Sequence, residues 1–155
     1  MVRTPRFLAA ALLALPLAAC EVDSTQQTES LEAIEKADSL GDVKAALAAL
    51  PSAQVAGTED NGLPFMLTGN LGSASVTKGL AVDPSSRLNS ALPGIASAFR
   101  VSATDLIAKR SRTDEQGVTH VRYGQMKNGL PVVNEELVLH VAANNTIIAA
   151  NGTAH

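Results

Sequence analysis

This 155-residue chain has little cysteine, few basic residues and no long apolar run after its first twenty residues. These absences exclude a disulfide framework, a nucleic-acid-binding protein and a protein with several membrane spans. The chain contains one cysteine, no tryptophan and one tyrosine. A lone cysteine cannot form a disulfide scaffold. Lys and Arg total 12 against 15 Asp and Glu, for a formal net charge of −3, whereas binding nucleic acid requires clustered cations to neutralise phosphates. After residue 20 no apolar run approaches the ~18–20 residues of a membrane-spanning helix. The remaining class is one ordinary globular domain.

The first twenty residues indicate an export signal that ends at the single cysteine. Arg3 and Arg6 precede a short apolar run over residues 7–15, and the letters LAAC end at Cys20. That ending looks like a bacterial lipobox, in which the cysteine is acylated. We therefore expect residues 1–19 to be a lipoprotein signal peptide and Cys20 to carry a lipid anchor. The protein would be exported and held at the cell envelope, on its periplasmic or extracellular side. The alternative is a plain secretory signal.

Residues 20–55 are predicted to form a tether followed by an amphipathic helical segment. Residues 21–30 are polar apart from one valine, as in a flexible linker. The apolar residues that follow recur at three-, four- and six-residue steps, as one helical face would: Leu31, Ile34, Leu40, Val43, Leu47 and Leu50. Gly41 and Asp42 could divide this run into two short helices, and Pro51 ends it.

The remaining domain, residues 56–155, begins with one predicted strand and a helical stretch. The strand lies in the apolar, glycine-bounded segment 62–72. Asp83 followed by Pro84 is a good helix start, because Asp caps the first turn and Pro suits its first position. The apolar residues after it fall on one face: Leu88, Leu92, Ile95 and Phe99. Pro93-Gly94 inside this stretch predicts a kink or two short helices.

The last third of the sequence alternates with a period of two and predicts a strand meander. We expect strands at 106–112, 118–127, 132–142 and 146–151. Asn128-Gly129 between two of them is a strong hairpin signal. In the third strand the predicted core side consists of Val133, Leu137, Leu139 and Val141, and the predicted wet side consists of Asn134, Glu136 and His140. A helix followed by an antiparallel meander predicts an α+β fold in which the helix covers the apolar face of the sheet.

Four groups of residues within this meander form a recognisable pattern. They are Thr119-His120-Val121-Arg122, Tyr123 with Gln125, Asn128-Gly129-Leu130-Pro131-Val132, and Val138-Leu139-His140-Val141. The pattern resembles the FTP domain, the propeptide module of fungalysin-like and thermolysin-like zinc metallopeptidases. The resemblance covers roughly residues 60–152 and is densest over residues 117–141. It implies an FTP propeptide-like fold.

The resemblance also implies a function. FTP modules act as intramolecular chaperones and inhibitors of the peptidase that they precede. The implied partner is therefore a zinc metallopeptidase catalytic domain, which is joined in cis in the resembled family and would be bound in trans here. Family precursors continue into a PepSY module and a peptidase domain with a His-Glu-x-x-His motif, and neither is present before the sequence ends at His155. Two alternatives stay open: a truncated metallopeptidase precursor, and an envelope lipoprotein that binds another surface protein.

The residues offer no catalytic constellation, so we expect a non-enzymatic chain without a cofactor. The histidines are His120, His140 and His155, and none has the spacing of a zinc peptidase. His120 and His140 lie on adjacent predicted strands, where they could pair and share a metal, but solvent-facing polar residues are the simpler interpretation. Glu135 and Glu136 are adjacent on a strand and therefore point to opposite faces. No nucleophile elbow or phosphate-binding loop is present.

Partner binding is consequently the predicted activity. The expected contacts are the wet face of the meander and the hairpin tip. The candidate residues, in sequence order, are Tyr123, Gln125, Asn128, Gly129, Leu130, Pro131 and Val132. For the tip, a plain turn followed by a strand-starting proline accounts for the same residues.

Overall fold

A computed structural model describes residues 40–76 and 83–154 of the chain. The predicted signal peptide, Cys20, the polar tether, Leu31 and Ile34 lie outside these ranges. None of the helices in the described ranges is long and apolar enough to cross a membrane.

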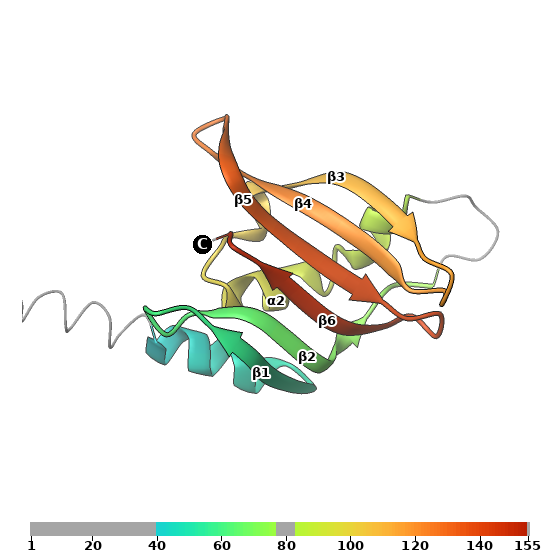
Figure 1. The fold of residues 1–155 in the computed structure, drawn as a ribbon, viewed down its shortest axis with the longest axis horizontal. Helices are drawn as coiled ribbons and strands as arrows, with labels where there is room; N and C mark the ends of the chain where they lie inside the picture. Colours follow the sequence, from blue (N-terminus) through green and yellow to red (C-terminus); the bar gives the residue numbers. More distant parts are fainter. Residues whose placement is uncertain (1–39, 77–82, 155) are drawn as a thin grey trace, which may run out of the picture.

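Six antiparallel strands form one twisted sheet (Figure 1). They are β1 (Ser52–Thr58), β2 (Pro64–Ser73), β3 (Leu106–Thr113), β4 (Thr119–Lys127), β5 (Leu130–Val141) and β6 (Thr146–Gly152). The order across the sheet is β1-β2-β6-β5-β4-β3. The predicted meander of the last four strands is confirmed, and β2 extends it by pairing with β6. The α+β architecture is confirmed as well.

Short helices cover one face of this sheet (Figure 1). They are the 3-10 helices η1 (Pro84–Leu88) and η2 (Ala103–Asp105) and the α-helix α2 (Leu92–Ala98). The Asp83 carboxylate accepts a hydrogen bond from the backbone N–H of Ser85 at 2.9 Å, which caps η1 as predicted. The stretch is divided into two short helices because Pro93 lacks the N–H that a helix interior needs and is tolerated only in a first turn.

The core lies between these helices and the inner face of the sheet. All four predicted helical residues are buried there, and Leu88 and Ile95 are completely inaccessible. They belong to one cluster with inward side chains of five strands, β2 to β6, which include Leu67, Leu106, Val121, Leu137, Leu139 and Ile147. Burying each such side chain contributes roughly 1.5–3 kcal/mol to folding. The opposite face of the sheet is left to the polar side chains described below.

A helix over residues 40–49 packs beside the same core. Gly41 and Asp42 lie within this helix, and the first half of the predicted helical run lies outside the described residues. Val43 is buried, and Leu47 and Leu50 pack against the core cluster from the same helical face. The chain then enters β1, an edge strand that sequence analysis did not predict. The predicted domain start at residue 56 falls inside β1, so the sheet begins earlier in the sequence.

One predicted core position is wrong because β5 contains a large bulge. Val133 is 81% exposed, whereas Leu137, Leu139 and Val141 are buried as predicted. Between the pairs formed by Glu136 and Pro131, β5 has four residues where β4 has one. Asn134 within the bulge adopts a left-handed conformation with φ 65°. A bulge breaks the alternation of faces, so period-two reasoning fails for the residues before it.

Candidate functional site

The β4–β5 hairpin carries most of the predicted partner-binding residues and extends beyond the body of the sheet (Figure 1). Lys127 pairs with Leu130 across a two-residue turn. Both turn residues have positive φ, 52° at Asn128 and 79° at Gly129. These angles correspond to the type I′ turn that Asn-Gly favours, so the hairpin prediction is confirmed.

Apolar side chains are unusually accessible at this hairpin. Leu130 is 70% exposed, and Val133 three residues later is 81% exposed. Pro131 beside them is also exposed, while Val132 is half-buried. Single exposed apolar residues are common on protein surfaces. Here two of them lie within four residues on a projecting hairpin, an arrangement suited to contact with another protein.

Tyr123 and Gln125 lie elsewhere. Both point to the inner face of the sheet, where Tyr123 is 3% and Gln125 is 6% exposed. Neither side chain can touch a partner directly in this arrangement. The Tyr123 hydroxyl is buried without a hydrogen-bond partner among the residues that the structure describes. Burial raises the pKa of Tyr123 to about 12, with a smaller contribution from the negative charge of Asp83.

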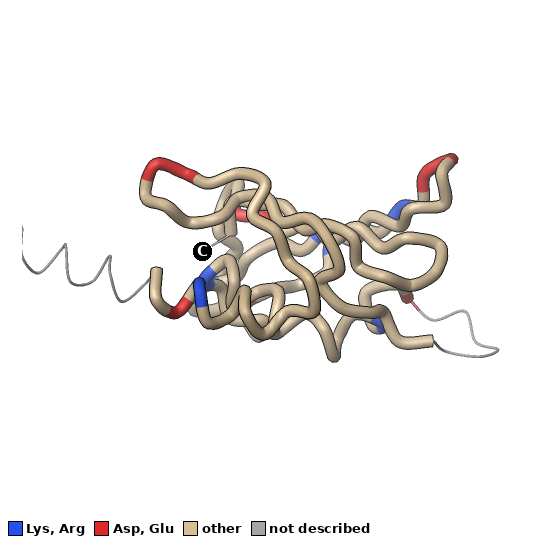
Figure 2. The backbone as a smooth tube through the Cα atoms, turned by 90° about the horizontal axis from the view of Figure 1, so that it is seen from below, with Lys and Arg blue, Asp and Glu red and all other residues tan. Residues whose placement is uncertain are grey.

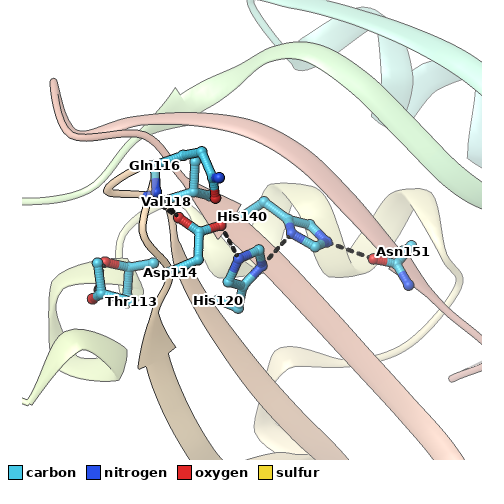
Figure 3. Close-up of polar contacts among 8 residues, drawn as sticks. Thr113, Asp114, Gln116, Val118, His120, His140 and Asn151 are labelled. Carbon is cyan, nitrogen blue, oxygen red and sulfur yellow. Dashed lines mark hydrogen bonds and ion pairs between the residues drawn. The ribbon is translucent and has the colours of Figure 1, made fainter.

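The outer face of the sheet contains a chain of four hydrogen-bonded side chains (Figure 3). His120 on β4 lies directly opposite His140 on β5. Their Nδ1 atoms are 2.7 Å apart. At one end His120 Nε2 is 2.9 Å from Asp114 Oδ2, and at the other His140 Nε2 is 2.6 Å from Asn151 Oδ1. Residues from the β3–β4 turn and from three strands therefore form one network.

Elementary hydrogen-bond chemistry sets the direction of two of these contacts. A carboxylate only accepts, so His120 Nε2 donates to Asp114. Of the two facing Nδ1 atoms, one donates and the other accepts.

Asp114 accepts a hydrogen bond from His120 at one end of this network and also shapes the turn before β4. Its Oδ1 atom accepts backbone N–H groups of Gln116 and Val118 at 3.0 and 2.9 Å. The hydrogen bond from His120, followed by that from the Val118 backbone, keeps the pKa of Asp114 below its usual value of 3.8. The carboxylate is therefore ionised at neutral pH.

Arginines surround the histidine pair on the same face. Arg112 lies opposite His120, and Arg110 lies opposite Arg122, across the β3–β4 ladder. Together they line an open pocket of about 290 Å³, whose polar lining is Arg110, Arg112, Arg122, His120, His140 and Asn151. Arg122 also forms an ion pair with Glu136.

Two acidic pairs occupy turns at opposite ends of the sheet, Glu59–Asp60 and Asp114–Glu115 (Figure 2). Asp114 and Glu136 contact residues that line the pocket. No carboxylate lines the pocket itself within the part of the chain that the structure describes. A chain with net negative charge thus presents a locally basic hollow.

The two histidines contact each other directly through a hydrogen bond between Nδ1 atoms 2.7 Å apart. Within residues 40–76 and 83–154, no group of three metal-ligating side chains comes together.

The arginine-lined pocket was not identified from sequence, although a signal for it exists. Arg110 and Arg112 alternate on one strand, and His120 and Arg122 alternate on the next. Two residues spaced by two on each arm of a hairpin share a face when the register matches. The register depends on a bulge at Lys109 that the sequence pattern does not reveal.

Comparison with known families identifies the meander. Residues 104–154 match the family model of the Fungalysin/Thermolysin Propeptide Motif. This segment covers β3 to β6, the hairpin tip and the polar network. Neither the curated proteins nor the solved structures that were searched include a match to the chain. The matched motif is a propeptide motif and not a catalytic one, and propeptides of this type associate with a metallopeptidase catalytic domain in the precursor.

Proposed function

We propose that this chain is a propeptide-type inhibitor and folding chaperone for a thermolysin-like or fungalysin-like zinc metallopeptidase. The observation that carries the proposal is the propeptide motif over residues 104–154, which contains the projecting hairpin with its exposed apolar tip. The chain would act without chemistry of its own. A surface complementary to the folded peptidase stabilises that state by mass action and obstructs access to substrate.

The contact surface that we propose combines the hairpin tip with the outer face of the sheet. Leu130 and Val133 supply apolar anchors, and the basic pocket supplies charge. A stable complex requires roughly 800 Å² from each partner. The tip alone is too small, so the neighbouring outer face has to contribute. Tyr123 and Gln125 would support this surface from the core side without touching the partner.

We also propose that the protein works outside the cytoplasm, because its relatives by motif are propeptides of secreted peptidases. Export through residues 1–19 and acylation at Cys20 would place the propeptide unit at the cell envelope. Metabolic labelling with a fatty acid tests the anchor. Label is expected in the wild-type protein and should be lost in Cys20→Ser. Equal labelling of both would contradict it.

Inhibition in trans tests the proposed function. The purified chain should slow cleavage of a peptide substrate by a thermolysin-like peptidase and raise the yield when that peptidase is refolded from denaturant. The double variant Leu130→Asp with Val133→Asp should weaken inhibition about tenfold or more, as loss of an anchor does.

Val76→Asp is the matched control for these substitutions. Val76 is 70% exposed, like Leu130, and lies outside the hairpin, so its inhibition constant should stay within about twofold of wild type. Absence of any effect of the wild-type chain on activity and refolding, tested over several thermolysin-like and fungalysin-like peptidases, would overturn the proposal.

A further inference from the structure

The outer face of the sheet places like charges opposite one another, which normally destabilises a sheet. Arg110 faces Arg122 across the β3–β4 ladder, and Arg112 faces His120. Like charges directly opposite on adjacent strands repel, whereas opposite charges attract. Such an arrangement is explained if this face of the sheet binds an anion, which would offset the repulsion.

The charge balance of the pocket supports this explanation. Three guanidinium groups line the hollow, and two carboxylates contact its lining. Glu136 pairs with Arg122, and Asp114 pairs with His120. No described acidic side chain pairs with Arg110 or Arg112. An excess of positive charge therefore faces the open pocket.

The chemistry of the lining defines the ligand. Guanidinium groups bind two oxygens of one oxyanion through parallel N–H donors. The pocket, with a volume of about 290 Å³, admits a small group but not a large organic molecule. From this geometry we propose that the pocket formed by Arg110, Arg112, Arg122, His120 and His140 is an oxyanion-binding site that takes a carboxylate or a similarly small oxyanion.

Sulfate is the appropriate probe because it is a small oxyanion with a constant charge near neutral pH. Sodium sulfate titrated into the full chain, against sodium chloride at equal ionic strength, should give saturable shifts of the His120 and His140 NMR signals. Shifts that are linear in sulfate, or equal in chloride, indicate an adventitious ion only and overturn the site.

Two double variants that each remove two positive charges distinguish binding in the pocket from a general effect of net charge on sulfate affinity. Arg110→Gln with Arg112→Gln should weaken sulfate binding at least about tenfold. Lys44→Gln with Arg100→Gln removes the same charge from exposed positions outside the pocket and the hairpin and should leave the affinity within about twofold. All four positions are exposed, so both variants should fold. Equal losses in the two variants would overturn the proposal.

The source of the anion is tested separately, and only this step rests on the proposed function. If a carboxylate of the bound peptidase fills the pocket, sulfate and the Arg110/Arg112 variant both weaken inhibition, and the Lys44/Arg100 variant does not. If a free anion fills the pocket, neither added sulfate nor the Arg110/Arg112 variant changes inhibition, although the wild-type chain still binds sulfate. Sulfate binding without any inhibition would overturn the proposed function and leave the site standing.

Discussion

At the scale of single residues, two polar side chains on β4 differ in how fully they are hydrogen-bonded. The inward Tyr123 has a buried hydroxyl for which the described residues provide no partner, whereas the outward His120 has a hydrogen bond at each ring nitrogen. A buried polar group without a partner costs about 1–3 kcal/mol. The buried hydroxyl of Tyr123 therefore lowers the stability of the fold, and a substitution that removes it should raise that stability.

Tyr123→Phe removes this hydroxyl and keeps the ring. We expect the free energy of unfolding to rise by about 1 kcal/mol, because the ring stays packed and the desolvated oxygen is gone. Urea unfolding at pH 7 measures this. Tyr123→Leu is the control for ring packing and should lower stability. A loss of stability in Tyr123→Phe would show that the hydroxyl is bonded.

The same residue predicts a loss of stability at high pH. Burial raises the pKa of Tyr123 to about 12, while the unfolded chain titrates near 10. The contribution is fully present below pH 10 and is lost as the pH rises toward 12, because only the unfolded state releases the proton. Between pH 9 and 11.5 the wild-type protein should lose more stability than Tyr123→Phe. Parallel curves for the two proteins would contradict the shift.

Asp114 has the opposite dependence. Its pKa in the folded state lies below 3.8, so its contribution is present above that pH and is lost as the pH falls through the lowered value. Asp114→Asn should therefore be less stable than wild type at pH 7, and the difference should shrink below pH 4. Urea midpoints at pH 7 and pH 2.5 measure this. A difference that is independent of pH would exclude the carboxylate as its cause.

At the scale of secondary-structure elements, close approach of backbones decides which positions tolerate change. A Cβ atom at Gly152 on β6 would lie 2.0 Å from the carbonyl oxygen of Glu136 on β5. That oxygen also accepts backbone N–H groups from Thr153 and Ala154, at 3.0 and 3.3 Å, where the chain leaves the sheet. The β5–β6 contact is thus fixed tightly just beside the β5 bulge.

Gly152→Ala should lower the free energy of unfolding by about 2 kcal/mol or more, because backbone atoms have to move. Gly41→Ala is the matched control. Its Cβ would meet nothing within 4 Å. Gly41 lies in the helix of residues 40–49, so alanine there should raise stability by about 0.5–1 kcal/mol. No cost at Gly152 would contradict the observed spacing of the strands.

Prediction from sequence succeeded for elements whose signal is local. The Asn128-Gly129 turn, the Asp83 cap and the four C-terminal strands each depend on residues close together in the chain. β1 was missed because it is a mostly exposed edge strand, so its sequence SAQVAGT shows little apolar alternation. The exposure of Val133 and the arginine pocket were missed because bulges in β5 and β3 set their register.

At the scale of the whole molecule, the two faces of the sheet have different roles. The inner face holds the core against η1, α2 and the helix of residues 40–49. The outer face contains the basic pocket and continues to the projecting hairpin tip at Leu130 and Val133. Most of the apolar burial therefore lies on one face, and the proposed recognition surface lies on the other.

Hydrogen exchange of the chain, with and without a thermolysin-like peptidase whose active site is blocked, tests this account most directly. Our account predicts slower exchange over the hairpin of residues 127–133 and on the neighbouring β4 and β5 when the peptidase is bound, with the helix of residues 40–49 unchanged. Exchange that is unaffected by saturating peptidase, or protection confined to that helix, would contradict it.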